Sequence, residues 1–337
     1  MPDISKINAV AVADIEKLDS ILAANIEKVN GLTFPAAQAG SAAAYSVRLL
    51  DSLLGTTYTG AAMRVRRETA GGAGDDDEAD IAFDTSLTDP TISLDSAISN
   101  ASTGVTATTL GQFINVGTVN GTTYTNPDSL TVTASCFADE WKDQSGNANH
   151  ASQSTFGSQP QIHSGTVDTD LILENGKPAL SAAGNTSAGF MLINNTGWNI
   201  NNLSCFFAGV NSTAPGTPPI TLGAFADGAA WYQNWSGLVY YGTSSIGGTI
   251  SRGSQTLTAL IASTSQSTLY VRQDGSVNVS SSTVNAVVGS TTVGLGHLGG
   301  FYTDTGHKWQ EVIVYASDQY NNISSIETDI NGFFGIY

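Results

Sequence analysis

The first 29 residues repeat a hydrophobic pattern with helical spacing. Hydrophobic residues recur every three or four positions, and the tetrapeptides Ile4–Ile7, Ile15–Leu18 and Ile26–Val29 repeat every eleven residues. Eleven residues make three turns of about 3.67 residues each, so one apolar stripe runs nearly straight along such a helix. Asn30-Gly31 provides a signal for its end. The pattern therefore predicts a helix over residues 3–29.

An amphipathic helix of this kind needs a surface against which its apolar stripe can pack. We interpret residues 1–35 as an attachment or oligomerisation segment, and the small, weakly patterned residues 36–44 as a linker. The expected partners are further copies of the chain, giving a homo-oligomer, or other proteins of the same assembly. Packing on the rest of its own chain is the alternative. The stripe consists of Ile4, Ile7, Ile15, Leu18, Leu22, Ile26 and Val29.

From residue 45 onward the pattern is typical of β-structure. Hydrophobic and polar residues alternate over Tyr45–Leu49 and Met63–Arg66, and short apolar runs separated by Gly, Asn, Asp and Pro continue toward the C-terminus. The run Trp309–Tyr315 indicates a central, largely buried strand. Residues Asn322–Phe334 return to helical spacing, with isoleucines three and four positions apart. The sequence predicts one mainly β domain over residues 45–337, closed by a short helix.

The composition narrows the classes of partner. The formal net charge is −17, only 12% of residues are charged, and no basic run occurs, which argues against nucleic-acid binding. An anionic membrane surface would repel such a chain, and no apolar stretch reaches membrane-spanning length. The N-terminus lacks the pattern of a signal peptide. We therefore expect a protein made in the cytoplasm that has no nucleic-acid or membrane partner.

Residues 141–151, Trp-Lys-Asp-Gln-Ser-Gly-Asn-Ala-Asn-His-Ala, form the most specific stretch, and Gln159–Ile162 follows it. This run resembles the signature of concanavalin A-like, or laminin-G-like, sandwich domains in tailed-phage virion proteins. A close variant occurs in the catalytic domain of α-L-arabinofuranosidase B. Glu174–Ala179 and Gln310–Tyr315 are similar to further elements of these domains, and the resemblance extends over about residues 42–337. It implies a jelly-roll β-sandwich.

The resemblance also implies a function. It indicates a non-enzymatic structural protein of a phage virion, exposed on the particle as a surface appendage, tail fibre or head decoration. The helix of residues 1–35 would then bind other virion proteins, because similar isoleucine-lysine repeats occur at the N-termini of marine phage structural proteins. A binding module for host or environmental glycans is compatible with this role. The alternative is a glycoside hydrolase of arabinofuranosidase-like type, since that enzyme has the same signature.

Hydrolysis of a glycosidic bond requires two carboxyl groups that flank it. Glu311 lies in a strongly β run, Asp304 precedes it by seven residues, and Glu140 and Asp143 flank Trp141. None of these spacings demands catalysis, and no Gly-x-Ser-x-Gly elbow or phosphate-binding loop is present. We interpret Glu311 as a structural acid and assign no catalytic residue.

The sequence indicates no cofactor. An acidic loop over residues 71–78 offers oxygen ligands for calcium, but it lacks the spacing of a dedicated calcium loop. The four histidines show no metal-ligand spacing, and Cys136 and Cys205 are expected to be buried free thiols. The arginines of residues 64–67 are expected to pair with Asp80 and Asp84. We therefore predict no metal site.

One aromatic cluster is a candidate for glycan binding. Residues 231–235, Trp-Tyr-Gln-Asn-Trp, precede a pair of tyrosines at positions 240 and 241. Aromatic rings stack on the apolar faces of sugars, and the neighbouring amides can bind sugar hydroxyls. Packing of these rings inside the sandwich is the alternative interpretation. The candidate residues are Trp231, Tyr232, Trp235 and Tyr240.

Overall fold

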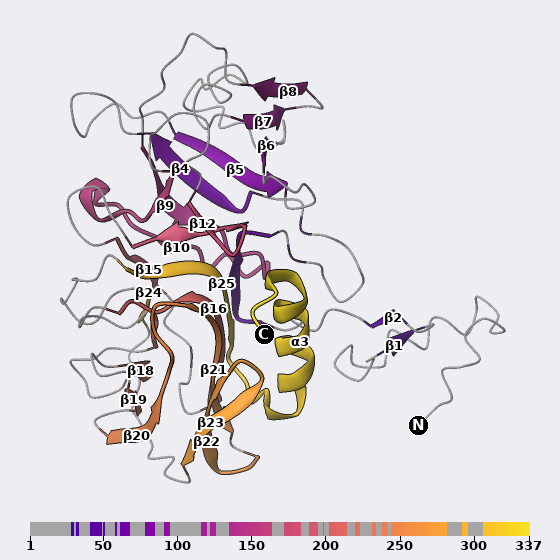
Figure 1. The fold of residues 1–337 in the computed structure, drawn as a ribbon, viewed down its shortest axis with the longest axis vertical. Coiled ribbons are helices and arrows are strands. Elements are labelled where there is room, and N and C mark those ends of the chain that lie inside the picture. The colour runs from indigo at the N-terminus through magenta and orange to yellow at the C-terminus, as the bar shows by residue number, and fades with distance from the viewer. Residues whose placement is uncertain are drawn as a thin grey trace, which may run out of the picture.

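The computed structural model is mainly β, and among its described residues a single α-helix follows the last strand (Figure 1). The strands form two antiparallel layers. The described residues are 28–29, 32–33, 41–48, 50, 58, 61–67, 78–84, 91–94, 116–119, 122–125, 135–163, 172–182, 189–194, 198, 202–213, 220–222, 231–233, 238–241, 244–263, 265–281, 292–295 and 306–337.

The first layer contains the longest strands and has the C-terminal helix on its outer face. Strand β25 is paired on both sides, and all residues of Trp309–Tyr315 are buried, which confirms the predicted buried strand. In order across the layer, the strands are β3 (Ala43–Ser46), β25 (Lys308–Tyr315), β16 (Ser204–Val210), β21 (Gln255–Ser263), β22 (Thr268–Gln273) and β23 (Ser276–Ser281).

The second layer is longer and more irregular. In order, its strands are β5 (Glu78–Asp84), β4 (Met63–Arg67), β9 (Cys136–Trp141), β10 (Ala151–Ser152), β15 (Met191–Asn194), β24 (Thr292–Leu295), β17 (Ile220–Leu222), β18 (Trp231–Gln233), β19 (Leu238–Tyr241) and β20 (Ser244–Thr249). Beyond β5 the ladder continues through β6 (Thr91–Leu94), β7 (Val116–Val119) and β8 (Thr122–Thr125), and β6 pairs with β7 in parallel.

Two short strands join the layers at one margin. β11 (Gln161–His163) pairs with β9 of the second layer and with β14 (Leu180–Ser181), and β14 pairs with β25 of the first layer. At the opposite margin β20 contacts β23. One hydrophobic core includes residues of both layers, among them Phe206 and Val312 from the first and Trp141 and Ile193 from the second. The mainly β sandwich is therefore confirmed, whereas its jelly-roll connectivity stays a prediction.

The predicted C-terminal helix is also confirmed. Helix α3 (Ile323–Phe334) buries Ile323, Ile326 and Ile330, which share one face at helical spacing, and packs on β16 and β21. The helix ends at Gly335, whose φ of 63° is left-handed and whose N–H donates to the Asn331 carbonyl oxygen.

The predicted N-terminal helix is not supported. Residues 1–27 lie outside the described part of the chain. The last two residues of the predicted helix, Lys28 and Val29, form a strand instead. β1 (Lys28–Val29) pairs antiparallel with β2 (Leu32–Thr33). Asn-Gly is the connection that two-residue hairpins prefer, so the same dipeptide that suggested a helix end suits a hairpin here.

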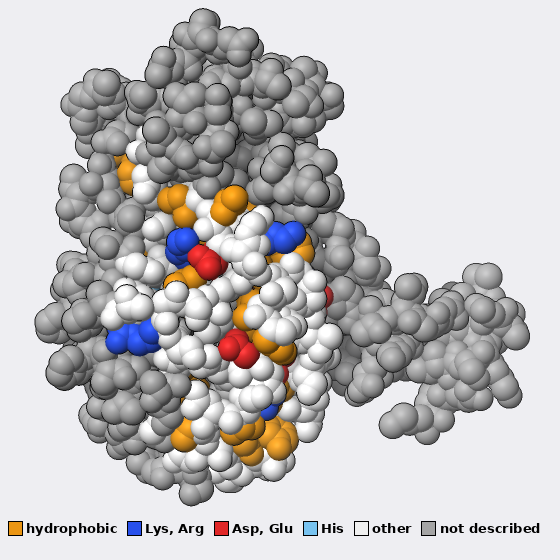
Figure 2. Space-filling model, viewed as in Figure 1, with side chains coloured by type: hydrophobic (Ala, Val, Ile, Leu, Met, Phe, Trp, Pro, Cys, Tyr) orange, Lys and Arg blue, Asp and Glu red, His pale blue; other side chains and the backbone are white. Residues whose placement is uncertain are grey.

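The surface beside α3 has few charges. On the described part of the face in Figure 2, Lys and Arg side chains form separate spots among uncharged polar atoms, as the low charged content of the chain leads one to expect. Two minor elements lie nearby, the hairpin of β12 (Leu173–Glu174) with β13 (Lys177–Pro178) and the 3-10 turn Tyr320–Asn322. No helix in the described ranges has both the length and the apolar character needed to cross a membrane.

Candidate functional site

The stretch Trp141–Ala151 contains a loop that follows strand β9 and forms hydrogen bonds with the backbone of strand β3. The Oδ1 atom of Asp143 accepts hydrogen bonds from the backbone N–H groups of Ala44 and Ser145, and its Oδ2 atom accepts one from Asn149, each at 2.9 Å. Two of these bonds are local side-chain-to-backbone contacts, whereas the bond from Ala44 spans 99 positions. Asp143 is 3% exposed, and backbone N–H groups donate to both oxygens of its carboxylate.

The amides of the same loop bind the backbone around β3. Gln144 Nε2 donates to the carbonyl oxygens of Ser46 and Arg48 at 2.9 and 3.1 Å. The side-chain amides of Asn147 and Asn149 donate to carbonyls of the segment just before β3, at 2.9 and 2.7 Å. Buried backbone carbonyls need such partners. These side chains of the signature stretch therefore hold the backbone around β3 in place.

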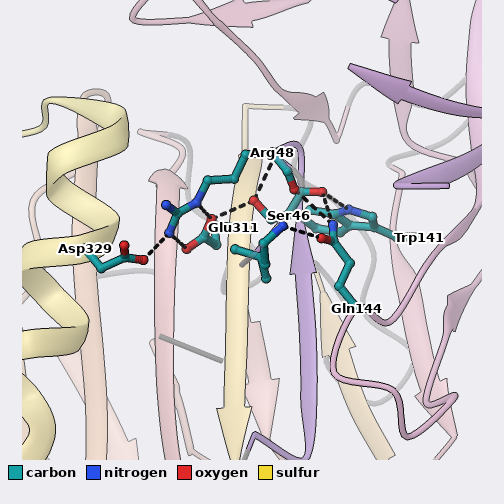
Figure 3. Close-up of polar contacts among 7 residues, drawn as sticks. Ser46, Arg48, Trp141, Gln144, Glu311 and Asp329 are labelled. Carbon is teal, nitrogen blue, oxygen red and sulfur yellow. Dashed lines mark hydrogen bonds and ion pairs between the residues drawn. The ribbon is translucent and has the colours of Figure 1, made fainter. Parts of the chain in front are cut away.

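A second polar centre surrounds Glu311 on the outer face of β25 (Figure 3). The Glu311 side chain is fully buried. Its Oε2 atom accepts from Ser46 Oγ at 2.6 Å and from Arg48 Nε at 2.7 Å, and its Oε1 atom accepts from Arg48 Nη2 at 2.9 Å. The same Nη2 atom donates to Asp329 Oδ2 of helix α3 at 2.6 Å. One guanidinium therefore joins two carboxylates, one from the sheet and one from the helix.

The charges of this centre hold each other in place. Burial of the Arg48 guanidinium acts to lower its pKa, but the charges and hydrogen bonds of Glu311 and Asp329 outweigh burial and raise that pKa above its ordinary value. A guanidinium does not lose its proton at neutral pH, so it cannot act as a general acid. With both oxygens of Glu311 occupied, the arrangement suits attachment of α3 to the sheet better than proton transfer to a sugar.

A second arginine pair fixes the same helix. Arg272 of β22 forms two hydrogen bonds with Glu327 of α3, Nε to Oε1 and Nη2 to Oε2, both at 2.8 Å. The hydrogen bond with Glu327 is the main cause that raises the pKa of Arg272. Glu327 is 2% exposed, and this bidentate partner satisfies both of its buried oxygens. Both buried acids beside α3 are therefore structural, which agrees with the interpretation of Glu311 from the sequence.

Arg64 of β4 pairs with an acid of the neighbouring strand β9. Arg64 Nη2 lies 2.7 Å from Asp139 Oδ2 on β9. The register of the ladder places Asp80 of β5 opposite Arg64, but the side chains of Asp80 and Asp84 lie outside the described part. The expectation that an acid neutralises Arg64 holds, and the acid comes from the strand on the other side.

The remaining reactive groups serve the fold where they are described. Cys205 is a buried free thiol, as predicted, and burial raises its pKa; the side chain of Cys136 lies outside the described part. His150 Nδ1 and His307 Nδ1 accept hydrogen bonds from backbone N–H groups at 2.9 and 3.1 Å. No group of three His, Cys, Asp or Glu side chains in the described ranges could hold a metal ion.

The candidate glycan-binding residues lie on one hairpin. β18 and β19 pair antiparallel, with Tyr232 opposite Tyr240 and Trp231 opposite Tyr241. The pattern of residues 231–241 thus brings three of the four candidate residues onto neighbouring strands. Their side chains, and all of Trp235, lie outside the described part of the structure.

The other predicted contacts lie mostly outside the described residues. Of the predicted assembly residues, only Val29 falls on a described position, in β1; those outside are Ile4, Ile7, Ile15, Leu18, Leu22 and Ile26. The same is true of Asp304 and of most of the acidic loop, where Glu78 begins β5.

Arg48, the residue that connects the sheet to the helix, was not predicted from the sequence. Its signal was present, because Ser46 and Arg48 occupy the polar positions of the alternating run Tyr45–Leu49. A lone cation on the polar face of an otherwise apolar strand needs a carboxylate, and Glu311 was the one acid predicted within a strongly β run near the C-terminus.

Comparison with known proteins shows the fold. A mutant of GH54 α-L-arabinofuranosidase soaked with 4-nitrophenyl α-L-arabinofuranoside matches with a TM-score of 0.54 and 15% identity over 87% of this chain and 63% of that one. An arabinofuranosidase complexed with arabinofuranosyl-α-1,2-xylobiose gives 0.52, also at 15% identity, over 87% of this chain and 62% of that one. GH54 α-L-arabinofuranosidase soaked with a cyclic sulfate inhibitor gives 0.53 and 15% over 87% and 63% of the two chains.

These matches establish a shared β-sandwich fold, and the chain spans less than two thirds of each matched enzyme. No family model matches the sequence. No curated protein matches it either. Because one fold hosts many activities, the fold by itself decides no function.

Proposed function

We propose that the chain is a non-enzymatic β-sandwich that binds carbohydrate and is exposed on the surface of a phage particle. The observation that carries the non-enzymatic part is the environment of Glu311. The acid is fully buried, and Arg48 and Ser46 occupy both its oxygens. A glycoside hydrolase needs two carboxyl groups that face the bond to be cleaved, and this acid faces a guanidinium.

Carbohydrate binding is supported by the fold and by the β18–β19 hairpin. The matched enzymes include one complexed with an arabinose-containing oligosaccharide. The hairpin pairs Tyr232 with Tyr240 and Trp231 with Tyr241, and aromatic side chains with neighbouring amides are typical of sugar-binding surfaces. Host or environmental glycans are the proposed ligands.

A glycan array with the full chain, followed by calorimetry on the best sugar, tests the binding. Trp231→Ala and Trp235→Ala should each weaken binding by about tenfold, since loss of one stacked ring removes about 1 kcal/mol or more. Tyr337→Ala is the control, because this aromatic residue is 53% exposed and lies on another element. Binding that survives both tryptophan substitutions would refute the hairpin site.

The virion role rests on the resemblance of the Trp141–Ala151 stretch to tailed-phage proteins and on the eleven-residue repeat of the N-terminal segment. Other virion proteins and further copies of the chain are the proposed partners of residues 1–35. Immunogold electron microscopy of purified particles tests this role, with antibody raised against the sandwich. Label on the capsid indicates a head decoration, and label on the tail indicates an appendage or fibre. A protein found in the lysate but absent from particles would contradict the virion role.

The alternative is an arabinofuranosidase-like hydrolase, and the fold shared with GH54 enzymes over 87% of the chain favours it. The test is hydrolysis of 4-nitrophenyl α-L-arabinofuranoside by the full chain. We expect no turnover above the spontaneous rate. Turnover that disappears on replacing one acid by its amide, with the fold intact by circular dichroism, would favour the hydrolase over the non-enzymatic protein.

A further inference from the structure

The sequence contains the dipeptide Asn-Gly at positions 30, 120, 175 and 331, and the structure describes the surroundings of the last two. Asn-Gly is especially prone to deamidation, because glycine has no side chain to hinder attack of its backbone nitrogen on the asparagine side chain. The two described copies therefore carry the same chemistry in two different surroundings, a hairpin turn and a helix.

Asn175 and Gly176 form the whole connection of the β12–β13 hairpin. Glu174 pairs with Lys177, so two residues make the turn, and both have positive φ, 50° and 71°, as such short hairpin turns require. Both residues are exposed, and the Gly176 N–H donates no hydrogen bond within the described part of the structure. The attacking nitrogen is thus open to water, which can take up its proton.

Asn331 and Gly332 lie near the end of α3, where the same attack is hindered. The Gly332 N–H is inside the helix, and such groups donate to the carbonyl oxygen four positions back. The Asn331 side chain is also held at both ends of its amide. Its Oδ1 atom accepts from the Ile336 and Tyr337 N–H groups at 2.8 and 3.0 Å, and its Nδ2 atom donates to the Tyr337 carbonyl oxygen at 2.8 Å. Attack at Asn331 therefore requires the end of the helix to open first.

The Asn175 side chain connects the hairpin to the end of α3. Its Nδ2 atom donates to the carbonyl oxygens of Phe334 and Gly335 at 2.9 and 3.2 Å. The last carbonyls of a helix have no partner within the helix, so this amide supplies one from outside. The nitrogen that deamidation expels is therefore the atom that makes the contact.

We propose that Asn175 is a site of spontaneous deamidation, which releases the β12–β13 hairpin from the end of α3. The Gly176 nitrogen loses its proton to water and forms a bond to Asn175 Cγ, the Cγ–Nδ2 bond breaks, and Nδ2 takes up a proton and leaves as ammonia. Water then opens the cyclic imide at either of its two carbonyls, which leaves an aspartate or an isoaspartate. The reaction consumes only water.

Both products lose the contact with α3. An aspartate carboxylate has no hydrogen to donate, and it would face the Phe334 and Gly335 carbonyl oxygens at the negative end of the helix macrodipole. An isoaspartate adds a methylene group to the main chain of a two-residue turn, whose type depends on its length. The hairpin also carries Lys177, whose ammonium lies 4.7 Å from the centre of the Phe333 ring. Movement of the hairpin therefore uncovers this side of the helix as well.

The first test follows the full chain during incubation in mildly alkaline buffer, where the Gly176 nitrogen loses its proton faster. Samples are digested with pepsin in acid, which suppresses further deamidation, and mapped by mass spectrometry. We expect replacement of NH2 by OH at Asn175 to be about tenfold faster than at Asn331, where attack waits for local opening of the helix. Equal rates at the two sites, or an unmodified Asn175, would overturn the proposal.

Asn175→Asp tests the release itself, with hydrogen exchange of residues 173–178 as the readout. Exchange should be about tenfold faster than in the wild type, because two hydrogen bonds to the helix end are lost. Asn331→Asp is the matched control, since a carboxylate there still accepts from the Ile336 and Tyr337 N–H groups, and it should leave exchange in the hairpin unchanged. Exchange as slow in Asn175→Asp as in the wild type would show that the hairpin stays in place without the amide, and would contradict the release.

Discussion

At the scale of single residues, we expect the stability of the protein to be sensitive to substitution of Glu311. It is fully buried and accepts from Arg48 and Ser46, so Glu311→Gln leaves the Arg48 charge with one carboxylate in place of two. We expect the free energy of unfolding in urea to fall by about 3 kcal/mol. Glu174→Gln is the matched control, since its partner Lys308 is 31% exposed, and it should cost less than about 1 kcal/mol. Equal losses would contradict the special role of the buried pair.

Two buried phenols predict how the protein responds to alkaline pH. Burial and the nearby Asp143 charge raise the pKa of Tyr45, and burial and the Glu311 charge raise the pKa of Tyr315. In the unfolded chain both ionise near pH 10. Their contribution to stability is therefore complete below about pH 10 and is lost as pH rises toward the folded-state pKa.

Tyrosinate absorbance during an alkaline titration measures this effect. Of the eleven tyrosines, at least two should ionise only when the protein unfolds, as followed by circular dichroism. Tyr45→Phe and Tyr315→Phe should each reduce that delayed group by one. Ionisation of all phenols near pH 10 with an intact fold would show that these two rings are not enclosed.

At the scale of elements, the two glycines near the end of α3 should respond to alanine in opposite directions. Gly332 lies inside the exposed part of the helix, and a Cβ added there meets nothing within 4 Å. Gly335 has a φ of 63°, and its added Cβ would meet only Asn175 at 3.9 Å. Gly332→Ala should raise the free energy of unfolding by about 0.5–1 kcal/mol, and Gly335→Ala should lower it by about 1 kcal/mol. Thermal unfolding of both variants measures the difference, and changes of the same sign would contradict the left-handed end of the helix.

The elements that the sequence predicted well are those whose pattern has one physical interpretation. Isoleucines at helical spacing in a segment of 12 residues fit a helix on a surface, and the β-branched and aromatic residues of the short run Trp309–Tyr315 favour a buried strand. The Asn30-Gly31 dipeptide is different, because both a helix end and a hairpin use it. The preceding periodicity favoured the helix, and β1 and β2 form a hairpin.

At the scale of the whole molecule, long-range pairing decided what the sequence could not show. The composition and the resemblance of Trp141–Ala151 indicated a sandwich, and the fold confirms it. Nothing local connects Arg48 to Asp329, because 281 positions separate them. The ladder of β3 with β25 and the packing of α3 on the same layer bring the two side chains together. Predictions of polar clusters therefore need the register, which a single sequence does not supply.

The N-terminal repeat makes a prediction about assembly that is independent of the sandwich. The full chain, of 34.8 kDa, should sediment as a homo-oligomer, and a chain that begins at residue 41 should sediment as a monomer. Ile15→Asp with Leu22→Asp places charge in the predicted apolar stripe and should have the same effect as the truncation, because a charge is costly to bury. Lys17→Ser, on the polar side of the repeat, is the control and should leave the oligomer intact. An oligomeric truncated chain would move the assembly contact from residues 1–35 to the sandwich itself, and a monomeric full chain would contradict the predicted homo-oligomer.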